Sequence, residues 1–210
     1  MVKEGSYQGL IDNLAKRNIK GVYCADCALA RDYILNIIPL GCSVGMSGSL
    51  SLEDIGIIQR LEERGNKVFN QYKSGLKREE AIALRRLGSG ADYYLTGVNA
   101  VSSAGELVFF SAYGERISGI ACAKKVIVAC GVNKITSNLE AALERTRERV
   151  APLNCRRLNW ASACLDSGEC RKEICFSPGY KRMCSQVFII ESEISLGRLE
   201  LVLIGKELGL

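Results

Sequence analysis

The sequence contains no histidine among its 210 residues. This absence excludes Ser–His–Asp and Cys–His nucleophile systems, histidine-ligated zinc and histidine proton shuttles. Any acid–base chemistry in this chain therefore falls to aspartate, glutamate, lysine, cysteine or tyrosine side chains.

Aromatic residues are scarce as well, at 7% of the chain, although 48% of the residues are hydrophobic. We therefore expect a core built mainly from aliphatic side chains. The net charge is +5, the basic residues are scattered, and no aromatic residues interleave with them. Nucleic-acid binding is disfavoured, because such interfaces gather basic residues into a patch or stripe.

Long apolar runs are missing too. No run approaches the ~20 residues that a membrane helix needs, and the N-terminal stretch lacks the apolar segment of a signal peptide. We expect a cytoplasmic protein without membrane contact. Its ten cysteines are then expected to be thiols or metal ligands, because disulfides are rare in the cytosol.

Strand and helix patterns alternate up to residue 150. Short apolar segments predict strands at 21–24, 43–45, 67–69, 93–95 and 126–130. Helical patterns cover 25–37, a stretch from 51, and the segments 77–87 and 138–150. This alternation predicts βαβ units and an α/β fold of three layers, with a mostly parallel sheet flanked by helices. We expect a single domain over 1–210.

The C-terminal part of the chain does not continue this alternation of strands and helices. A cysteine-rich, turn-rich insertion spans 154–186, and strand patterns follow at 187–191 and 199–204. We expect these two strands to pair as a hairpin at a sheet edge. The last long helix should begin with a capping box of Ser137 and Glu140 and end before Pro152.

A glycine-rich turn, Gly45 to Asp54, joins a predicted strand to a predicted helix. Glycines let backbone N–H groups face an anion, and the helix N-terminus adds partial positive charge. The turn therefore suits an anion, although a tight structural turn with Ser51 as helix cap explains the same residues. Glu53 falls in the first helical turn, where the helix dipole favours a carboxylate; it is also the candidate catalytic acid or base.

Two further loops follow predicted strands, at 96–99 and 131–134. In open α/β sheets, ligands bind at the carboxyl ends of the strands. Lys134 could pair there with a phosphate or carboxylate, or be a solvated loop lysine. We expect the three loops to meet in one pocket that binds a small anion.

Four cysteines in the insertion follow the spacing C-x5-C-x4-C-x8-C: Cys164, Cys170, Cys175 and Cys184. Four thiolates brought together by turns can hold zinc or an iron–sulfur cluster, and reduced structural thiols are the alternative. Cys155 is near enough in sequence to be a spare ligand. Cys24 and Cys27 form a C-x-x-C pair, but the surrounding elements do not suit a redox motif. The remaining cysteines, Cys42, Cys122 and Cys130, are expected to be buried small hydrophobes.

Several motifs resemble the lactate utilisation (LUD) domain family: GCSVGMSGSLSLEDIG at 41–56, ADYYLTGVNAVSSAGELV at 91–108, then GERI, KKVIVACGVNKI and APLN. The resemblance implies a fold of the NagB/RpiA/CoA-transferase-like kind, shared with sugar isomerases and CoA transferases. It places eight residues on the family's motif: Gly48, Ser49, Glu53, Thr96, Gly97, Asn99, Asn133 and Lys134.

The chain also departs from the family pattern. Phe109 to Ala112 replace an Asn and an Asp-Gly pair, and Cys122-Ala123 replace a Gly-Pro. Asn99 stands where the isomerase-like enzymes use an aspartate, and an amide cannot act as a general base. Isomerase chemistry is therefore not expected. Phe109 and Phe110 are best explained as a strand that packs an aromatic ring inward.

These observations leave three functions open. The first is binding of a small anionic metabolite (an organic acid, a sugar phosphate or a CoA ester) in organic-acid metabolism. The second is an accessory role as a metal- or cluster-binding partner of an iron–sulfur oxidoreductase. The third is a small-molecule sensor that has lost catalysis. A homo-oligomer is compatible with each of them.

Overall fold

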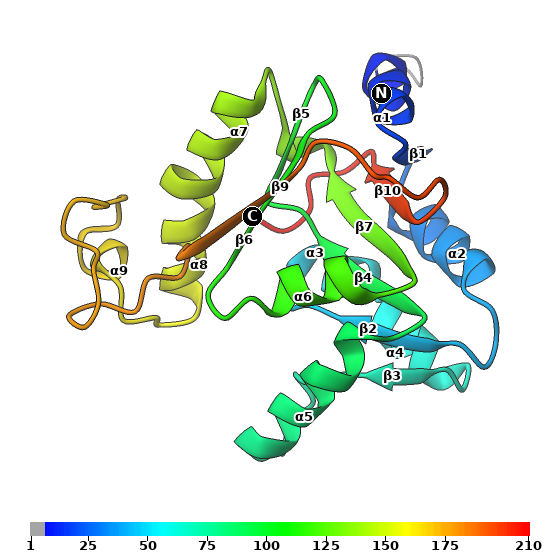
Figure 1. Ribbon diagram of the computed structural model, residues 1–210, viewed down its shortest axis with the longest axis horizontal. Coiled ribbons are helices and arrows are strands. Elements are labelled where there is room, and N and C mark those ends of the chain that lie inside the picture. Colours follow the sequence, from blue (N-terminus) through cyan, green and yellow to red (C-terminus); the bar gives the residue numbers. More distant parts are fainter. Residues whose placement is uncertain (1–6) are drawn as a thin grey trace.

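A computed structural model describes residues 7–210, so the first six residues of the expected domain lie outside it. Its larger sheet has six strands in the order β1-β10-β7-β4-β2-β3 (Figure 1). These are β1 (Lys20–Cys24), β10 (Leu199–Ile204), β7 (Lys125–Gly131), β4 (Tyr93–Gly97), β2 (Ser43–Met46) and β3 (Lys67–Phe69). Every pairing in this sheet is parallel, so the fold class expected from the sequence is confirmed.

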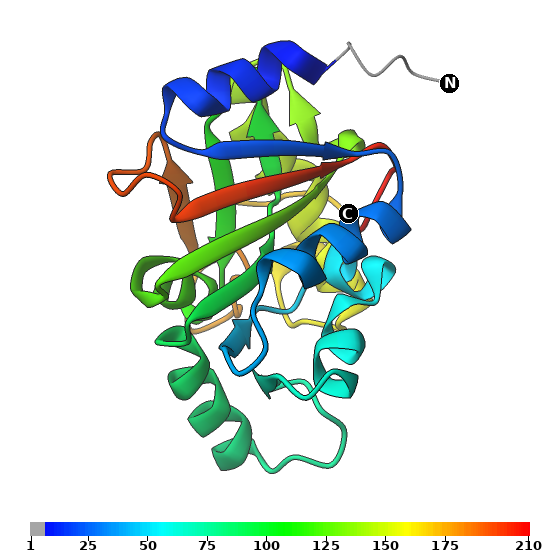
Figure 2. The same ribbon diagram turned by 90° about the vertical axis from the view of Figure 1, so that its right-hand side faces the viewer.

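Helices cover both faces of the large sheet, as Figure 2 shows. One face carries α2 (Cys27–Ile37), α3 (Leu50–Ile55) and α4 (Ile57–Glu63), and the other carries α1 (Gln8–Lys16), α5 (Arg78–Ser89) and α6 (Glu115–Cys122). Side chains alternate between the faces: Val126 and Val128 of β7 join one core cluster, and Ile127 and Ala129 join the other. A parallel sheet buried on both faces needs such near-continuous apolar strands.

A second, smaller sheet lies beside the first, in the order β8-β5-β6-β9. Its strands are β5 (Ala100–Ser102), β6 (Leu107–Ser111), β8 (Ile135–Thr136) and β9 (Gln186–Ile190). Phe109 is fully buried in β6 and joins the same core cluster as Leu107, which confirms the packing interpretation of the two phenylalanines. A short 3-10 turn, η2 (Val132–Lys134), leads from β7 into β8.

The expected C-terminal hairpin is wrong. Both strands exist, but β9 pairs antiparallel with β6 in the small sheet. The strand β10 lies between β1 and β7 in the large sheet and is parallel to both. The physical reason is burial: five of the six β10 residues are buried, and an apolar strand of this kind belongs in a sheet interior rather than at a half-exposed edge.

The last long helical run differs from the expectation at both ends. It consists of α7 (Leu139–Glu144), a π-helical stretch η3 (Arg145–Val150) and α8 (Ala151–Arg157). Asn138 caps it by accepting a hydrogen bond from the Ala141 N–H at 2.9 Å, so the predicted Ser137 box is wrong. Pro152 does not end the helix, because it lies in the first turn of α8, directly after the wider π-helical turn. Proline lacks an N–H and is tolerated where the helical hydrogen-bond pattern changes.

The cysteine-rich segment follows α8 and contains one short helix, α9 (Ala163–Ser167), among turns. It lies on the outer side of α8, away from the large sheet (Figure 1). Its description as an insertion within one domain stays a prediction. In the part of the chain that the structure covers, no helix combines the length and apolar content needed to cross a bilayer.

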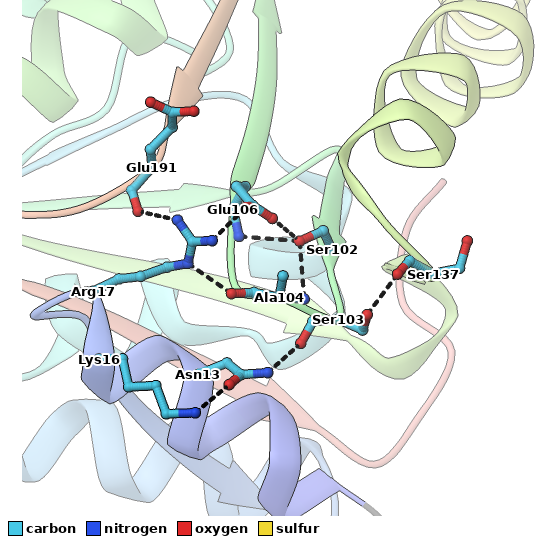
Figure 3. Close-up of polar contacts among 9 residues, drawn as sticks. All are labelled: Asn13, Lys16, Arg17, Ser102, Ser103, Ala104, Glu106, Ser137 and Glu191. Carbon is cyan, nitrogen blue, oxygen red and sulfur yellow. Dashed lines mark hydrogen bonds and ion pairs between the residues drawn. The ribbon is translucent and has the colours of Figure 1, made fainter.

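Arg17 connects the N-terminal helix to the small sheet (Figure 3). Its guanidinium donates to the carbonyl oxygens of Ala104 and Glu191, at 2.6 Å each, and forms an ion pair with Glu106. Asn13 adds a hydrogen bond to the Ser103 carbonyl at 3.0 Å. These contacts fix α1 and the residue that follows it against the small sheet.

Candidate functional site

A cavity with a volume of about 680 Å³ lies where the large sheet meets the small one. It is lined by the loops that follow β2, β4 and β7, by one face of α5, by the start of α6 and by part of the cysteine-rich segment. Its size falls within the roughly 300–1,000 Å³ typical of small-molecule sites.

Six of the eight residues expected at the site line this cavity, drawn from all three loops: Gly48, Ser49, Glu53, Gly97, Asn99 and Lys134. The parallel strands bring them together, because their carboxyl ends share one edge of the sheet. Thr96 and Asn133 are not among the lining residues. The Thr96 hydroxyl is buried 2.8 Å from the Ser47 hydroxyl, and Asn133 pairs with the backbone of Leu208.

Glycine is required where two of the loops touch. A Cβ atom at Gly97 would lie 2.3 Å from the Ser49 hydroxyl oxygen, and one at Gly48 would lie 3.0 Å from the Tyr72 ring. The Ser49 hydroxyl also caps α3 by accepting a hydrogen bond from the Leu52 N–H at 3.4 Å. Ser49, rather than Ser51, is therefore the helix cap.

Lys134 lies at the floor of the cavity. Its side chain is 4% exposed and donates to the Ser51 hydroxyl at 2.8 Å. Among residues 7–210, no carboxylate forms an ion pair with it. Burial away from water lowers the pKa of Lys134 to about 8, and the nearby charges of Arg116 and Arg145 act in the same direction.

Arg116, in the first turn of α6, also lines the cavity and was not identified from the sequence. Its guanidinium donates to Asn99 Oδ1 at 2.8 Å, to the Phe110 carbonyl at 3.2 Å and to the Gly48 carbonyl at 3.0 Å. Its Nε is buried without a hydrogen-bond partner. Burial lowers the pKa of Arg116, yet a guanidinium keeps its charge in proteins. The sequence signal that could have identified Arg116 is the GERI motif, in which this arginine is the third residue.

The acceptors that hold Arg116 are all neutral. Asn99 uses one oxygen for two bonds, accepting from Arg116 and from the Phe110 N–H at 2.9 Å. Its role in the structure is thus to orient the guanidinium. Within the described chain, no carboxylate forms an ion pair with Arg116. Glu115 lies near Arg116 and Asp54 lies near Lys134, and each carboxylate raises the pKa of its neighbouring cation without a direct contact.

The rest of the lining is also predominantly basic. Its cations include Arg78, Arg85, Arg157 and Lys181, and the carboxylate side chains are Glu53 and Glu115. The Ser111 hydroxyl donates to Glu115 at 2.7 Å. The Glu53 side chain is exposed to the cavity. The wall also includes the aromatic residues Tyr72, Phe110, Tyr113 and Trp160.

The cysteines occupy different environments. Cys24 and Cys27 are free thiols, and burial together with nearby carboxylates raises the pKa of both, unlike that of a reactive thiolate. Cys130 is buried, Cys42 is half-buried, and Cys122 is exposed, so the expectation of burial is wrong for Cys122.

The cysteines of the C-terminal segment gather around a second cavity of about 20 Å³, which Cys155, Cys164, Cys170, Cys175 and Cys184 line together. All five are free thiols. Among the described residues, no group of three or more histidine, cysteine, aspartate or glutamate side chains is placed so that it could hold a metal ion.

The fold and the three loops define an α/β domain with a basic cavity at the strand ends. A family model described as the LUD domain matches residues 7–204. The chain belongs to the LUD domain family, which makes it a protein of the lactate-utilisation type.

Solved structures resemble the fold at low sequence identity. A DUF162 family protein from Deinococcus radiodurans is 11% identical, with 97% of this chain and 98% of that chain covered and a TM-score of 0.54. Ribose 5-phosphate isomerase A from Methanocaldococcus jannaschii is 17% identical over 54% of each chain, with a TM-score of 0.35. The protein eIF2B delta from Chaetomium thermophilum is 17% identical, with 66% of this chain and 57% of that chain covered and a TM-score of 0.36. No curated protein matches the chain.

Proposed function

We propose that this chain binds a small anionic metabolite in the 680 Å³ cavity and that Arg116 and Lys134 hold its anionic group. The observation that carries this proposal is the pair of cations itself. Both line the cavity, and neither forms an ion pair with a carboxylate of residues 7–210.

The energetic argument is that a buried charge without a partner is costly and that a bound anion removes the cost. An anion about 4 Å from each cation gains roughly 4 kcal/mol per pair at an effective dielectric constant of 20, before the cost of its own desolvation. The loop of Gly48 and Ser49 lies beside Arg116, whose guanidinium bonds the Gly48 carbonyl. We place the anionic group of the ligand between this loop and the two cations.

The charged and aromatic residues of the lining indicate the ligand class. Organic acids, sugar phosphates and CoA esters all carry a carboxylate or phosphate, and the four outer cations suit a ligand with a second anionic group. The four aromatic residues of the lining suit a sugar or a base. We place the ligand within organic-acid metabolism, in keeping with the family.

Catalysis is a separate question from binding. Glu115 already accepts a hydrogen bond from Ser111, whereas the described residues give the Glu53 carboxylate no such partner. Glu53 is therefore the residue to which we assign proton transfer if the ligand is turned over. A sensor would bind the same ligand class without turnover, and an accessory role would add a stable complex with an iron–sulfur oxidoreductase.

Isothermal titration calorimetry on the full chain tests the proposal, with inorganic phosphate, lactate, ribose 5-phosphate and acetyl-CoA as probes. We expect binding of at least one probe, and a tenfold or greater loss of affinity in Arg116→Gln. The matched control is Arg86→Gln, which removes an exposed arginine of α5 that does not line the cavity. Absence of binding by all four probes, or equal affinity in both variants, would refute the proposal.

A further inference from the structure

Three planar side chains contact one another along the wall of the 680 Å³ cavity, although they come from distant parts of the chain. Arg85 belongs to α5, Tyr113 to the turn between β6 and α6, and Trp160 to the turn after α8. The Arg85 guanidinium lies 5.9 Å from the centre of the Tyr113 ring. The ring centres of Tyr113 and Trp160 are 5.9 Å apart at an interplanar angle of 73°. These values are typical of a cation–π contact and of an edge-to-face aromatic pair.

The pair of Tyr113 and Trp160 leaves ring faces open. In an edge-to-face pair, the edge of one ring meets a face of the other, so the pair itself covers only one of the four faces. Tyr113 is 64% exposed and Trp160 is half-buried. An open aromatic face in the wall of a cavity is a surface on which a flat ring can stack.

Hydrogen bonds fix the orientation of Trp160. Its indole N–H donates to the Lys181 carbonyl, and its backbone N–H donates to the Cys155 carbonyl at 2.9 Å. The Lys181 N–H in turn donates to the Ala161 carbonyl at 2.7 Å. A side chain that is already held in place loses little conformational freedom when a ligand binds, so it suits a stacking platform.

Asn154 of α8 adds a hydrogen-bond donor to the same wall. Its Oδ1 accepts two bonds from the Arg157 guanidinium, at 3.2 and 2.9 Å. Because a guanidinium can only donate, Oδ1 is the atom that faces Arg157 and the NH₂ group is directed elsewhere. Within residues 7–210, this NH₂ group donates to no acceptor. It is therefore available to a ring nitrogen or a carbonyl oxygen on the edge of a base.

The aromatic pair is near the residues to which we assign the anionic group. Arg116 follows Tyr113 by three residues, and three residues of fully extended chain span at most about 11 Å. A nucleoside phosphate carries its base and its phosphate on opposite ends of one ribose. One such molecule can place its phosphate at Arg116 and its base on the aromatic pair.

We propose that the ligand is a nucleoside phosphate whose base stacks on Tyr113 and Trp160 and accepts a hydrogen bond from Asn154. This inference rests on the proposed function, since it takes Arg116 and Lys134 as the site of the phosphate. A simple organic acid or a sugar phosphate has no base to stack. A CoA ester contains an adenine nucleotide, so free nucleotides and CoA esters share the chemistry that this wall recognises.

The test compares AMP with ribose 5-phosphate, which carries the same ribose and phosphate but no adenine. Trp160 is the single tryptophan of the chain, so its fluorescence reports a base stacked on it, and calorimetry gives the affinities. We expect AMP to quench the fluorescence and to bind at least tenfold more tightly than ribose 5-phosphate, because one stacked base changes affinity about fivefold to a hundredfold. Coenzyme A as a third probe distinguishes the two sources: tighter binding than AMP would identify a CoA ester, and weaker binding a free nucleotide.

Substitutions at Tyr113 separate stacking from general effects on the fold. Tyr113→Ser should weaken AMP binding at least fivefold and leave ribose 5-phosphate binding unchanged, whereas Tyr113→Phe should keep both. The matched control is Phe176→Ser, which removes a 59% exposed aromatic residue that lines neither cavity. It should bind both probes like the wild type. Circular dichroism of each variant verifies that the fold is retained.

The outcomes separate this inference from the proposed function. Equal affinity for AMP and ribose 5-phosphate, or undiminished AMP affinity in Tyr113→Ser, would overturn the base site. If ribose 5-phosphate binding is then still weakened by Arg116→Gln, the anion proposal stands without the base site. AMP binding that depends on Tyr113 but not on Arg116 would instead refute the placement of the phosphate. Absence of binding by AMP, coenzyme A and ribose 5-phosphate would overturn the inference outright.

Discussion

Lys134→Met should stabilise the protein at neutral pH, although it removes a hydrogen bond. In the folded state the pKa of Lys134 is about 8, against 10.5 for a free lysine. At about 1.4 kcal/mol per pH unit, keeping this amine protonated at pH 7 costs about 3 kcal/mol. Methionine has a similar length and no charge. The loss of the bond to Ser51 offsets about 1 kcal/mol, so the net gain is about 2 kcal/mol.

The sign of the pH dependence follows from the same shift. Because the folded-state pKa is below the unfolded one, the unfolded chain binds more protons between pH 8 and 10.5. The wild-type free energy of unfolding should therefore rise relative to Lys134→Met across this window. Above pH 10.5 the Lys134 amine is neutral in both the folded and the unfolded state. The wild type should then be more stable than Lys134→Met by about the energy of the Ser51 hydrogen bond.

Urea unfolding at pH 7 and at several values up to 10.5 measures this difference. Comparing the two proteins at each pH removes the contributions of groups they share. The control is Lys206→Met, which changes an exposed lysine outside the cavity and should leave the difference from wild type constant. A Lys134→Met variant that is less stable than wild type at pH 7 by 2 kcal/mol or more would refute the view of Lys134 as an uncompensated charge.

Three further substitutions test particular contacts. Gly97→Ala should destabilise the protein by about 1–3 kcal/mol in urea unfolding, since the new Cβ meets the Ser49 hydroxyl at 2.3 Å; the additional change Ser49→Ala should recover part of this loss, and an unchanged midpoint in the single variant would contradict the geometry. Asn99→Asp should weaken phosphate binding at least tenfold in calorimetry without loss of stability, because its carboxylate would neutralise Arg116; undiminished affinity would argue against Arg116 as the anion ligand. Arg17→Ala should cost about 2 kcal/mol by removing the connection of α1 to the small sheet, whereas the exposed Lys16→Ala should stay within about 0.5 kcal/mol; equal effects would show that the Arg17 contacts contribute little.

Much of the architecture was predictable from local patterns. The strands β2, β3, β4 and β7 and the helices α2 and α5 lie within a few residues of their predicted places. Each is signalled by its own apolar periodicity or by a glycine at its end, which are properties of a short stretch of chain. The mostly parallel sheet followed from the alternation of these elements.

The meeting of three loops in one cavity was also predictable, for a reason that needs no coordinates. Parallel strands place their carboxyl ends at one edge, so residues after β2, β4 and β7 must come near one another. Local reasoning could not predict which side chains face the cavity. Thr96 instead turns toward Ser47, and Asn133 bonds the chain near Leu208.

The sequence by itself determined most strands and helices of the large sheet, the family, and the loops from which a site would be built, because those follow from short-range patterns. The strands β5 and β8 and the helix α6 were not predicted. Only the tertiary structure decided that β10 enters the middle of the sheet. It also decided that Arg116 reaches across to Gly48 and Asn99. Each of these depends on contacts between residues far apart in the chain, and a contact of that kind leaves no periodic trace in the sequence around either partner.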